Sequence, residues 1–255
     1  MINNEEFRAA LEKRRDLCNA EQGKLNEIDG YNCDKCKNKG YIWKLDENLL
    51  DVRADCECIV VRDSLKRARN SGLGNILTDY SFEKYIAKEV WQEKLKNKAQ
   101  QFCTDDSAKW FFIGGQVGCG KTHLCTAISN YYINSGYNLM YMVWVEDSKK
   151  IKAVANDPSY QTEINKFKNA DVLYIDDFLK VRGGEQPTSA DINLAFEIIN
   201  HRLMNPEQIT IISSEKNLDE IAEYDEATMS RIFQLTGDYK FNIGKDKNKN
   251  YRTKP

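Results

Sequence analysis

The 255-residue sequence lacks any uninterrupted apolar run approaching the roughly 20 residues that a helix needs to cross a bilayer. Residues 1–15 are charged and contain no apolar stretch typical of a secretory signal, so we expect a cytoplasmic protein without a membrane segment. Neither sign of charge is in excess: 37 Lys and Arg stand against 39 Asp and Glu. This balance argues against a protein that coats nucleic acid by bulk charge, but it leaves room for a local basic groove.

Internal repeats and long low-complexity tracts are absent as well. Hydrophobic residues make up 41% of the chain and charged residues 30%, which is typical of a globular protein. Composition changes along the chain predict a small N-terminal domain over residues 1–61, a linker over 62–79 and a larger domain over 80–255. The linker contains a basic stretch, residues 62–69, and a glycine-containing loop or hinge at 71–74.

The larger domain alternates apolar runs with segments of helical periodicity. Strands are predicted at residues 110–114, 138–145, 171–175, 208–213 and 239–243. Helices are predicted at residues 121–135, 189–204 and 227–235. This alternation indicates an α/β fold in which helices flank a parallel sheet.

Eight cysteines are present, and four of them fall in one short segment. Cys33, Cys36, Cys56 and Cys58 form the pattern C-x₂-C…C-x-C, separated by an unremarkable loop. Disulfides are not expected in a reducing compartment, and four thiolates in a charged, core-poor segment suit tetrahedral Zn²⁺. The metal would then supply the folding free energy of this small domain. An iron–sulfur cluster and unliganded thiols are the alternatives.

Residues 115–122, GQVGCGKT, fit the phosphate-loop pattern G-x-x-x-x-G-K-[ST] between a predicted strand and a predicted helix. Backbone N–H groups and the helix N-terminus would face the phosphates of ATP. Lys121 would reach the β- and γ-phosphates, and the Thr122 hydroxyl would bind Mg²⁺. The predicted nucleotide-binding residues are Gly115, Gln116, Val117, Gly118, Cys119, Gly120, Lys121, Thr122 and His123.

Two alternatives apply to these residues, and the predicted site has one consequence. The glycines could form a merely flexible turn. His123 could be a packing or helix-terminus residue. Cys119 could make nucleotide hydrolysis sensitive to thiol modification, because it would lie against the bound nucleotide.

Acidic and polar residues at the ends of two later strands complete the predicted site. Asp176 would bind Mg²⁺, and Asp177 would orient or deprotonate the attacking water. Ser214 or Glu215 would report on the γ-phosphate. The alternatives are that the two aspartates cap the following segment and that Ser214 or Glu215 caps a helix over residues 217–222.

An arginine from a neighbouring subunit commonly completes such a site. Arg231, in a predicted helix after the strand at 208–213, is the first candidate for this arginine finger. Arg202 is the second candidate. For both residues, an ordinary surface position is the alternative.

Together these motifs resemble the DnaC-type replicative helicase loaders of bacteria and phages, which are AAA+ ATPases. The resemblance extends from about Tyr31 to Ile243. It rests on YNCDKCKNKG (31–40), CEC (56–58), DYSF (79–82), GQVGCGKTHL (115–124), YIDDF (174–178), IISSE (211–215) and SRI (230–232).

The resemblance implies a zinc-binding N-terminal domain that grips the replicative ring helicase. It also implies an AAA+ core that binds ATP and Mg²⁺, self-associates and contacts single-stranded DNA, so that the helicase is delivered during DNA replication. Asp177 stands where most AAA+ proteins have Glu, so hydrolysis is expected to be slow and to depend on the oligomer or on DNA. The short segment after Arg231 leaves no separate lid domain.

Two other functions stay open. An IstB-type ATPase that regulates a transposase shares the core, but the zinc segment weighs against it. An ATP-binding zinc adaptor with little hydrolysis is the second, whereas a small-molecule kinase lacks the expected lid arginines. DNA contact is expected at residues 62–69 and in the tail at 240–254, where Tyr251 could stack on a base; solvated surface charge is the alternative.

Overall fold

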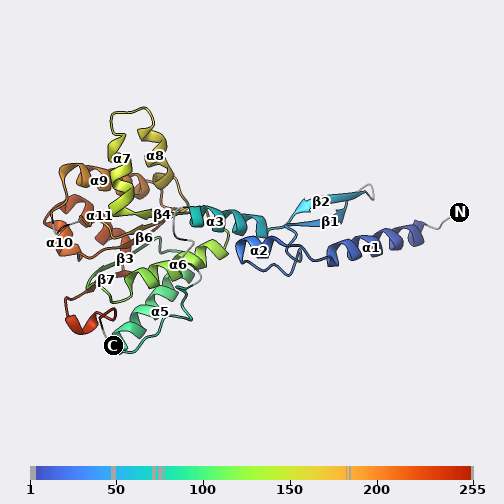
Figure 1. Ribbon diagram of the computed structural model, residues 1–255, viewed down its shortest axis with the longest axis horizontal. Helices are drawn as coiled ribbons and strands as arrows, with labels where there is room; N and C mark the ends of the chain where they lie inside the picture. The colour runs from blue at the N-terminus through green and yellow to red at the C-terminus, as the bar shows by residue number, and fades with distance from the viewer. Residues whose placement is uncertain are drawn as a thin grey trace. The chain divides into compact units, whose positions relative to one another are not determined.

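The computed structural model describes residues 4–46, 50–70, 73, 77, 79–181, 183 and 185–253 (Figure 1). The chain divides into two compact units, residues 1–66 and 67–255. Helix α3 (Cys58–Asn70) continues past the first unit, so the beginning of the predicted linker is helical. The predicted hinge at 71–74 lies, apart from Leu73, outside the described residues.

The first unit contains α1 (Asn4–Ala20), α2 (Leu25–Asp29), a hairpin of β1 (Tyr41–Leu45) and β2 (Asp51–Asp55), and most of α3. The antiparallel hairpin replaces the unremarkable loop that we expected between the cysteine pairs, so that prediction was wrong. The Asn19 side chain fastens α1 to β1, because its amide accepts a hydrogen bond from the Trp43 N–H (2.9 Å) and donates one to the Trp43 carbonyl (3.0 Å).

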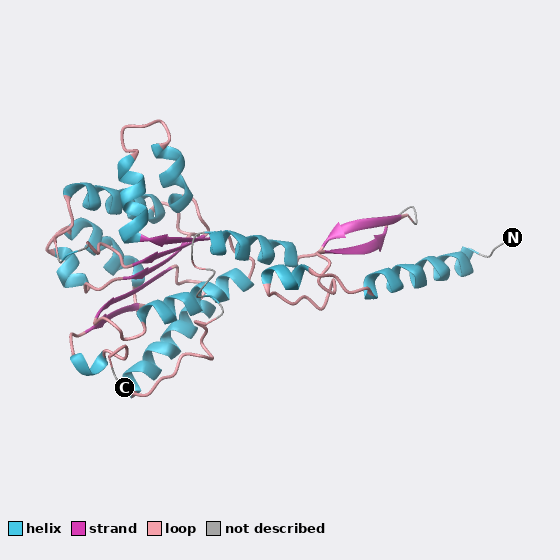
Figure 2. Ribbon diagram, in the orientation of Figure 1, coloured by secondary structure: helices cyan, strands magenta, loops and turns pink. Residues whose placement is uncertain are grey.

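The second unit is built on a five-stranded parallel sheet with the order β4-β5-β6-β3-β7 (Figure 2). The predicted strands are all present, with bounds that differ by one or two residues. They are β3 (Trp110–Gly115), β4 (Leu139–Val143), β5 (Val172–Asp176), β6 (Ile209–Ser213) and β7 (Lys240–Ile243). The α/β fold class predicted from the sequence is therefore confirmed.

Helices flank this sheet on both faces (Figure 1). Three of them match predicted segments, whereas α5, α7 and α8 were not predicted. The helices of the second unit are α5 (Val90–Thr104), α6 (Lys121–Asn134), α7 (Trp144–Ala153), α8 (Tyr160–Lys168), α9 (Ser189–Leu203), α10 (Leu218–Ala222), α11 (Glu226–Thr236) and the 3₁₀ turn η2 (Lys247–Lys249). No helix in the described part of the chain is long and apolar enough to span a membrane.

The interior strand β3, which lies between β6 and β7, is buried along its whole length and contributes side chains to both halves of the core. Trp110 and Phe112 belong to the cluster formed with the apolar faces of α9 and α11. Phe111 faces the other way and packs on Phe102 of α5 (ring centroids 5.4 Å apart). Successive strand side chains point to opposite faces, so one continuous apolar run can serve two helical layers.

The structure contradicts both interpretations of Arg202, an arginine finger and an ordinary surface residue, because its guanidinium is buried and hydrogen-bonded within its own subunit. Its side chain is fully buried beneath the end of α9. The guanidinium donates to the Thr210 hydroxyl (2.8 Å) and to the Ile209 carbonyl (2.7 Å) of β6. It also donates to three carbonyls around the end of α8, those of Phe167, Lys168 and Ala170. Arg202 is thus a structural cross-link.

Candidate nucleotide site and thiolate cluster

The phosphate loop joins β3 to α6, as predicted from its flanking elements. Its backbone takes left-handed values at Gly115 (φ 103°), Gly118 (φ 74°) and Gly120 (φ 95°). A Cβ at Gly115 would lie 2.0 Å from the Ile243 carbonyl oxygen, and one at Gly118 would lie 2.0 Å from the Asn250 side chain. The glycines of the motif are therefore required by backbone geometry and by close neighbours.

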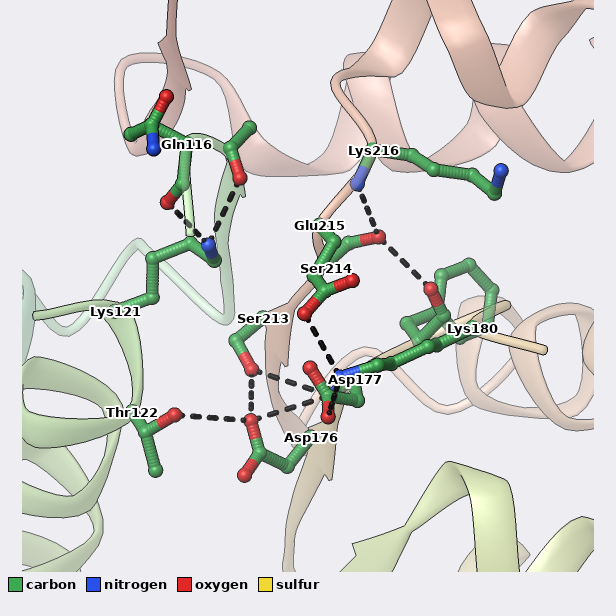
Figure 3. Close-up of polar contacts among 12 residues, drawn as sticks. Gln116, Lys121, Thr122, Asp176, Asp177, Lys180, Ser213, Ser214, Glu215 and Lys216 are labelled. Carbon is green, nitrogen blue, oxygen red and sulfur yellow. Dashed lines mark hydrogen bonds and ion pairs between the residues drawn. The ribbon is translucent and has the colours of Figure 1, made fainter. Parts of the chain in front are cut away.

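Lys121 is buried at the start of α6, and its ammonium lies against the loop (Figure 3). The Nζ donates to the carbonyls of Gly115 (2.9 Å) and Gln116 (2.7 Å). Burial lowers the pKa of Lys121, although nearby carboxylates oppose that shift. An ammonium group that is held next to the backbone N–H groups of the phosphate loop is well placed to bind a phosphate chain.

Asp176 and Thr122 meet beneath this loop, although 54 residues separate them in the sequence. The Thr122 hydroxyl donates to Asp176 Oδ1 at 3.4 Å (Figure 3). Ser213, at the end of β6, donates to the same oxygen, and the Tyr141 hydroxyl donates to Oδ2 (2.9 Å). One hydroxyl and one carboxylate held side by side are the protein ligands that Mg²⁺ takes in phosphate-loop proteins. We did not predict Ser213 and Tyr141; the parallel register of β4, β5 and β6 places them there.

Asp177 and Glu215 are joined by a residue that the sequence analysis missed. Lys180 Nζ lies 2.9 Å from Asp177 Oδ2 and 2.7 Å from Glu215 Oε1. Desolvation lowers the pKa of Lys180, but the hydrogen bonds to Glu215 and Asp177 outweigh it and raise that pKa overall. The ends of β5 and β6 are therefore bridged by an ammonium group.

Of the two predicted sensor residues, only Glu215 borders the cavity. The Ser214 side chain is buried, and its hydroxyl donates to the Phe178 carbonyl (2.8 Å). The following helix, α10, is capped by Asn217, whose side chain accepts from the Glu220 N–H (2.8 Å). Neither Ser214 nor Glu215 is thus the helix cap that we considered.

The predicted residues surround a cavity of about 380 Å³. From the predicted set, its walls include Val117, Gly118, Gly120, Lys121, Thr122, His123, Asp176, Asp177 and Glu215. Gly115, Gln116 and Cys119 belong to the phosphate loop but do not line this cavity. The structure adds Tyr80, Lys180 and two residues of the tail, Tyr251 and Arg252.

His123 serves as a packing residue at the wall of this cavity. Its ring stacks on Tyr80 (centroids 4.7 Å apart), and Nε2 lies 2.8 Å from the Ser81 carbonyl oxygen. Burial lowers the pKa of His123, which favours the neutral form of the imidazole. Its place beside an aromatic ring suits a wall for a nucleotide base better than a role in proton transfer.

The expected thiol sensitivity at Cys119 needs correction. The side chain is 1% exposed, and its Sγ donates to the Gln116 carbonyl (2.9 Å). Burial raises the pKa of this thiol, and only the thiolate reacts readily. Cys103 and Cys125 are buried as well.

The C-terminal tail runs back across the phosphate loop. The Tyr251 N–H donates to the Gly118 carbonyl (2.9 Å), and the Asp246 N–H donates to the Gln116 side chain (2.8 Å). The Tyr251 hydroxyl donates to Glu89 at the start of α5 (2.6 Å). Tyr251 therefore belongs to the nucleotide cavity, in place of the DNA-stacking role that we considered.

Arg231 lies on α11, away from the cavity of its own chain. Its guanidinium donates to the Ala227 carbonyl (2.9 Å) and lies over the Phe196 ring of α9, 4.8 Å from the centroid. An arginine so placed cannot serve the nucleotide of its own subunit without moving. A role toward a neighbouring subunit stays a prediction.

A second, larger groove of about 680 Å³ runs between α5 and the edge strand β7. Its cationic and aromatic lining residues are Trp91, Lys94, Lys98, Lys240, Phe241 and Lys249. Among the residues that the structure describes, no carboxylate lines it. Lys240 and Lys249 come from the predicted basic tail, whereas Lys94 and Lys98 of α5 were not predicted.

Arg62 was counted in the predicted basic stretch but is 6% exposed. It forms an ion pair with Asp29 and donates to the Tyr31 carbonyl (3.1 Å) and the Asn38 side chain (3.1 Å). This arginine therefore stabilises the first unit and is not available to DNA.

The four clustered cysteines converge as predicted. Their sulfur atoms all lie within 4.8 Å of one another; Cys33 and Cys56 are 3.8 Å apart, and Cys36 and Cys58 are 3.6 Å apart. Tetrahedral zinc with bonds of about 2.3 Å requires sulfur atoms about 3.8 Å apart, so the donor set fits Zn²⁺.

The backbone geometry around Cys36 supports binding of the same metal ion, Zn²⁺. The Gly40 N–H donates to Cys36 Sγ (3.3 Å), after a turn in which Lys37, Asn38 and Gly40 have positive φ. Burial raises the pKa of the Cys36 thiol, but the Gly40 N–H and the neighbouring thiols outweigh it and lower that pKa to about 7. Burial instead dominates at Cys56 and Cys58 and raises the pKa of both thiols, so Cys36 is the thiol of these three that ionises most readily.

Sequence comparison matches residues 77–236 to the bacterial DnaA ATPase domain family. The phage-like element PBSX protein XkdC of Bacillus subtilis is 28% identical over 84% of this chain and 83% of its own length. The replicative helicase loader DnaC of Buchnera aphidicola is 28% identical over 42% of this chain and 46% of its own length.

Among solved structures, a DnaC helicase loader superimposes with a TM-score of 0.55 and 19% identity over 66% of this chain and 97% of that chain. This likeness concerns the fold, and it agrees with the resemblance inferred from the motifs. The phosphate loop, the acidic end of β5 and the strands β3 to β6 all fall within the matched residues 77–236. The chain belongs to the bacterial DnaA ATPase domain family, and its AAA+ core has the fold of the DnaC-type helicase loaders.

Proposed function

We propose that this protein is an ATP-dependent loader that binds a replicative ring helicase and delivers it to single-stranded DNA during replication. The observation that carries the proposal is the joint presence of a complete phosphate-loop site and a separate tetrathiolate unit in one chain. The similarity to the protein named replicative helicase loader DnaC supports the same role.

In this proposal the cavity holds ATP and Mg²⁺. Lys121 binds the phosphates, and Thr122 and Asp176 hold the metal ion, which would offset the charge of the phosphate oxygens. Asp177 orients the attacking water and Glu215 senses the γ-phosphate. Hydrolysis is slow, since an aspartate reaches less far than the usual glutamate and since Arg231 acts only when a second subunit is present.

Zinc would hold the first unit together. Residues 1–66 are few for an independent core, and the cluster of Cys33, Cys36, Cys56 and Cys58 lies at the base of the β1–β2 hairpin. We propose that this unit binds the helicase. The thiols stay reduced in the cytoplasm, where the proposal places the protein.

The basic groove between α5 and β7 supports contact with single-stranded DNA. Lys94, Lys98, Lys240 and Lys249 offer positive charge, while Trp91 and Phe241 offer aromatic faces. Cationic tracks with aromatic platforms bind single strands without reading their sequence. We propose this groove as a DNA contact in place of the Arg62 region.

The test is a pull-down of the full chain with the replicative helicase of its host, with and without ATP. We expect co-purification by the wild-type chain and by Lys121→Ala without ATP, and loss of binding by the double variant Cys33→Ser, Cys56→Ser. Absence of helicase binding by the wild type, together with capture of a transposase, would instead favour an IstB-type regulator.

A further inference from the structure

The turn after β5 is held in an unusual backbone conformation. Asp177 (φ 55°) and Leu179 (φ 56°) both lie in the left-handed region without being glycine. Phe178 between them is fully buried; its N–H donates to the Ser213 carbonyl (2.8 Å), and its carbonyl accepts from the Ser214 hydroxyl (2.8 Å). Left-handed geometry is unfavourable for residues with side chains, and it persists only where the surroundings enforce it. Here the end of β6 enforces it.

The consequence of this turn is the position of Lys180. The Lys180 N–H closes the turn on the Asp177 carbonyl (3.0 Å), and its side chain then reaches the carboxylates of Asp177 and Glu215 (Figure 3). An ammonium group has three N–H donors, and these two contacts use two of them. The side chain is 34% exposed and lines the nucleotide cavity, so the third donor has access to an incoming ligand.

Charge is arranged unequally around this cavity. Lys121 lies on the phosphate-loop side, whereas Asp176, Asp177 and Glu215 lie at the ends of β5 and β6. Lys180 is the cation placed among those acids. A terminal phosphate that entered between the two sides would meet repulsion from the carboxylates and attraction from Lys180.

We infer that Lys180 is a positioning residue that detects the terminal phosphate of the nucleotide, taking a phosphate oxygen as a partner in exchange for Glu215 while it keeps Asp177 in place. This inference rests on the proposed function, because it requires ATP in the cavity. Exchange of Glu215 for phosphate releases the end of β6, so the presence of a triphosphate is transmitted to the segment that leads into α10.

The test compares the affinities of wild type, Lys180→Met and Lys180→Arg for ADP and for a non-hydrolysable ATP analogue, each with Mg²⁺. Methionine retains the apolar stem and removes the charge. We expect Lys180→Met to bind ADP within about twofold of wild type and the analogue about tenfold more weakly, with Lys180→Arg restoring most of the preference. Lys216→Met is the matched control, because Lys216 contacts Tyr224 (3.3 Å) outside the walls of this cavity.

A second variant tests the exchange itself. Glu215→Gln removes the competing charge, so we expect the preference for the analogue over ADP to rise. Equal losses for both nucleotides in Lys180→Met, an unchanged preference in that variant, or a lowered preference in Glu215→Gln would each overturn the inference. Each of these three outcomes would overturn the inference about Lys180 while the wild type still binds nucleotide, so the proposed function would stand. Failure of the wild type to bind either nucleotide would refute the proposed function as well.

Discussion

Arg202 and Arg231 come from helical segments of similar appearance, yet their surroundings are opposite. Arg202 is sealed between α8, α9 and β6, whereas Arg231 lies over the half-exposed face of α9. A one-dimensional pattern could not separate them, because the carbonyls that bind Arg202 come from residues up to 35 positions away. Lys121, Thr122 and Asp176 could be predicted, since local motifs specify them.

Replacing Arg202 by methionine should destabilise the fold by about 3 kcal/mol or more, because buried carbonyls around the end of α8 lose their donor. Chemical denaturation measures this loss. ATP affinity at low temperature should be unchanged, since Arg202 lies away from the cavity walls. An unfolding midpoint equal to that of wild type would contradict the assigned role.

Replacing Lys121 by alanine should abolish ATP binding, since the only ammonium held directly against the described phosphate loop is removed. Calorimetric titration with ATP and Mg²⁺ measures the effect. Lys149→Ala, at an exposed position on α7, is the matched control and should bind ATP as wild type does. Tight binding by Lys121→Ala would show that the site is wrongly assigned.

At the scale of elements, the β1–β2 hairpin and α5 show two reasons for incorrect prediction. The hairpin has short strands, with the side chains of β1 mostly half-buried and those of β2 mostly exposed, so its alternation is weak. In α5, the buried residues Leu95, Ala99, Phe102 and Cys103 follow helical spacing. That signal was available in the sequence and was obscured by the many polar residues around it. The strand positions were predicted because buried parallel strands are continuous apolar runs.

The tail across the phosphate loop gives a prediction at this scale. Ending the chain after Gly244 removes the contacts of Asp246 and Tyr251 with the loop, and it also removes Arg252 from the cavity. We expect ATP affinity to fall about tenfold, because the loop loses the neighbours that fix it. A chain ending after Thr253 serves as the control, and equal affinities for the two truncations would contradict this role.

The groove between α5 and β7 gives a second prediction at the scale of elements. The double variant Lys94→Gln, Lys98→Gln should weaken binding of oligo(dT) and lower the salt slope by about 1.4, since each phosphate contact on a single strand contributes about 0.7. Titrations at several salt concentrations measure this slope. Lys150→Gln with Lys166→Gln, whose lysines are paired with acids on α7 and α8, is the control. An unchanged slope in the groove variant would exclude the groove as the DNA contact.

For the whole molecule, the division into two units assigns the cysteine cluster to residues 1–66 and the phosphate loop to residues 67–255. Removal of zinc with a chelator should unfold the first unit and leave ATP binding by the second intact, because the cysteine cluster lies entirely within residues 1–66. Metal analysis should find one zinc per chain, and limited proteolysis should then cut only the N-terminal unit. A protease-resistant first unit without metal would contradict the zinc assignment.

Helicase loading is the central claim, and its most direct test uses circular single-stranded DNA. A closed helicase ring cannot thread onto a circle that has no ends, so stable association requires that the ring opens. We predict that the helicase becomes trapped on the circles when the wild-type chain and ATP are present and does not when the Cys33→Ser, Cys56→Ser chain replaces it. Equal trapping with and without the wild-type chain would contradict the proposed function.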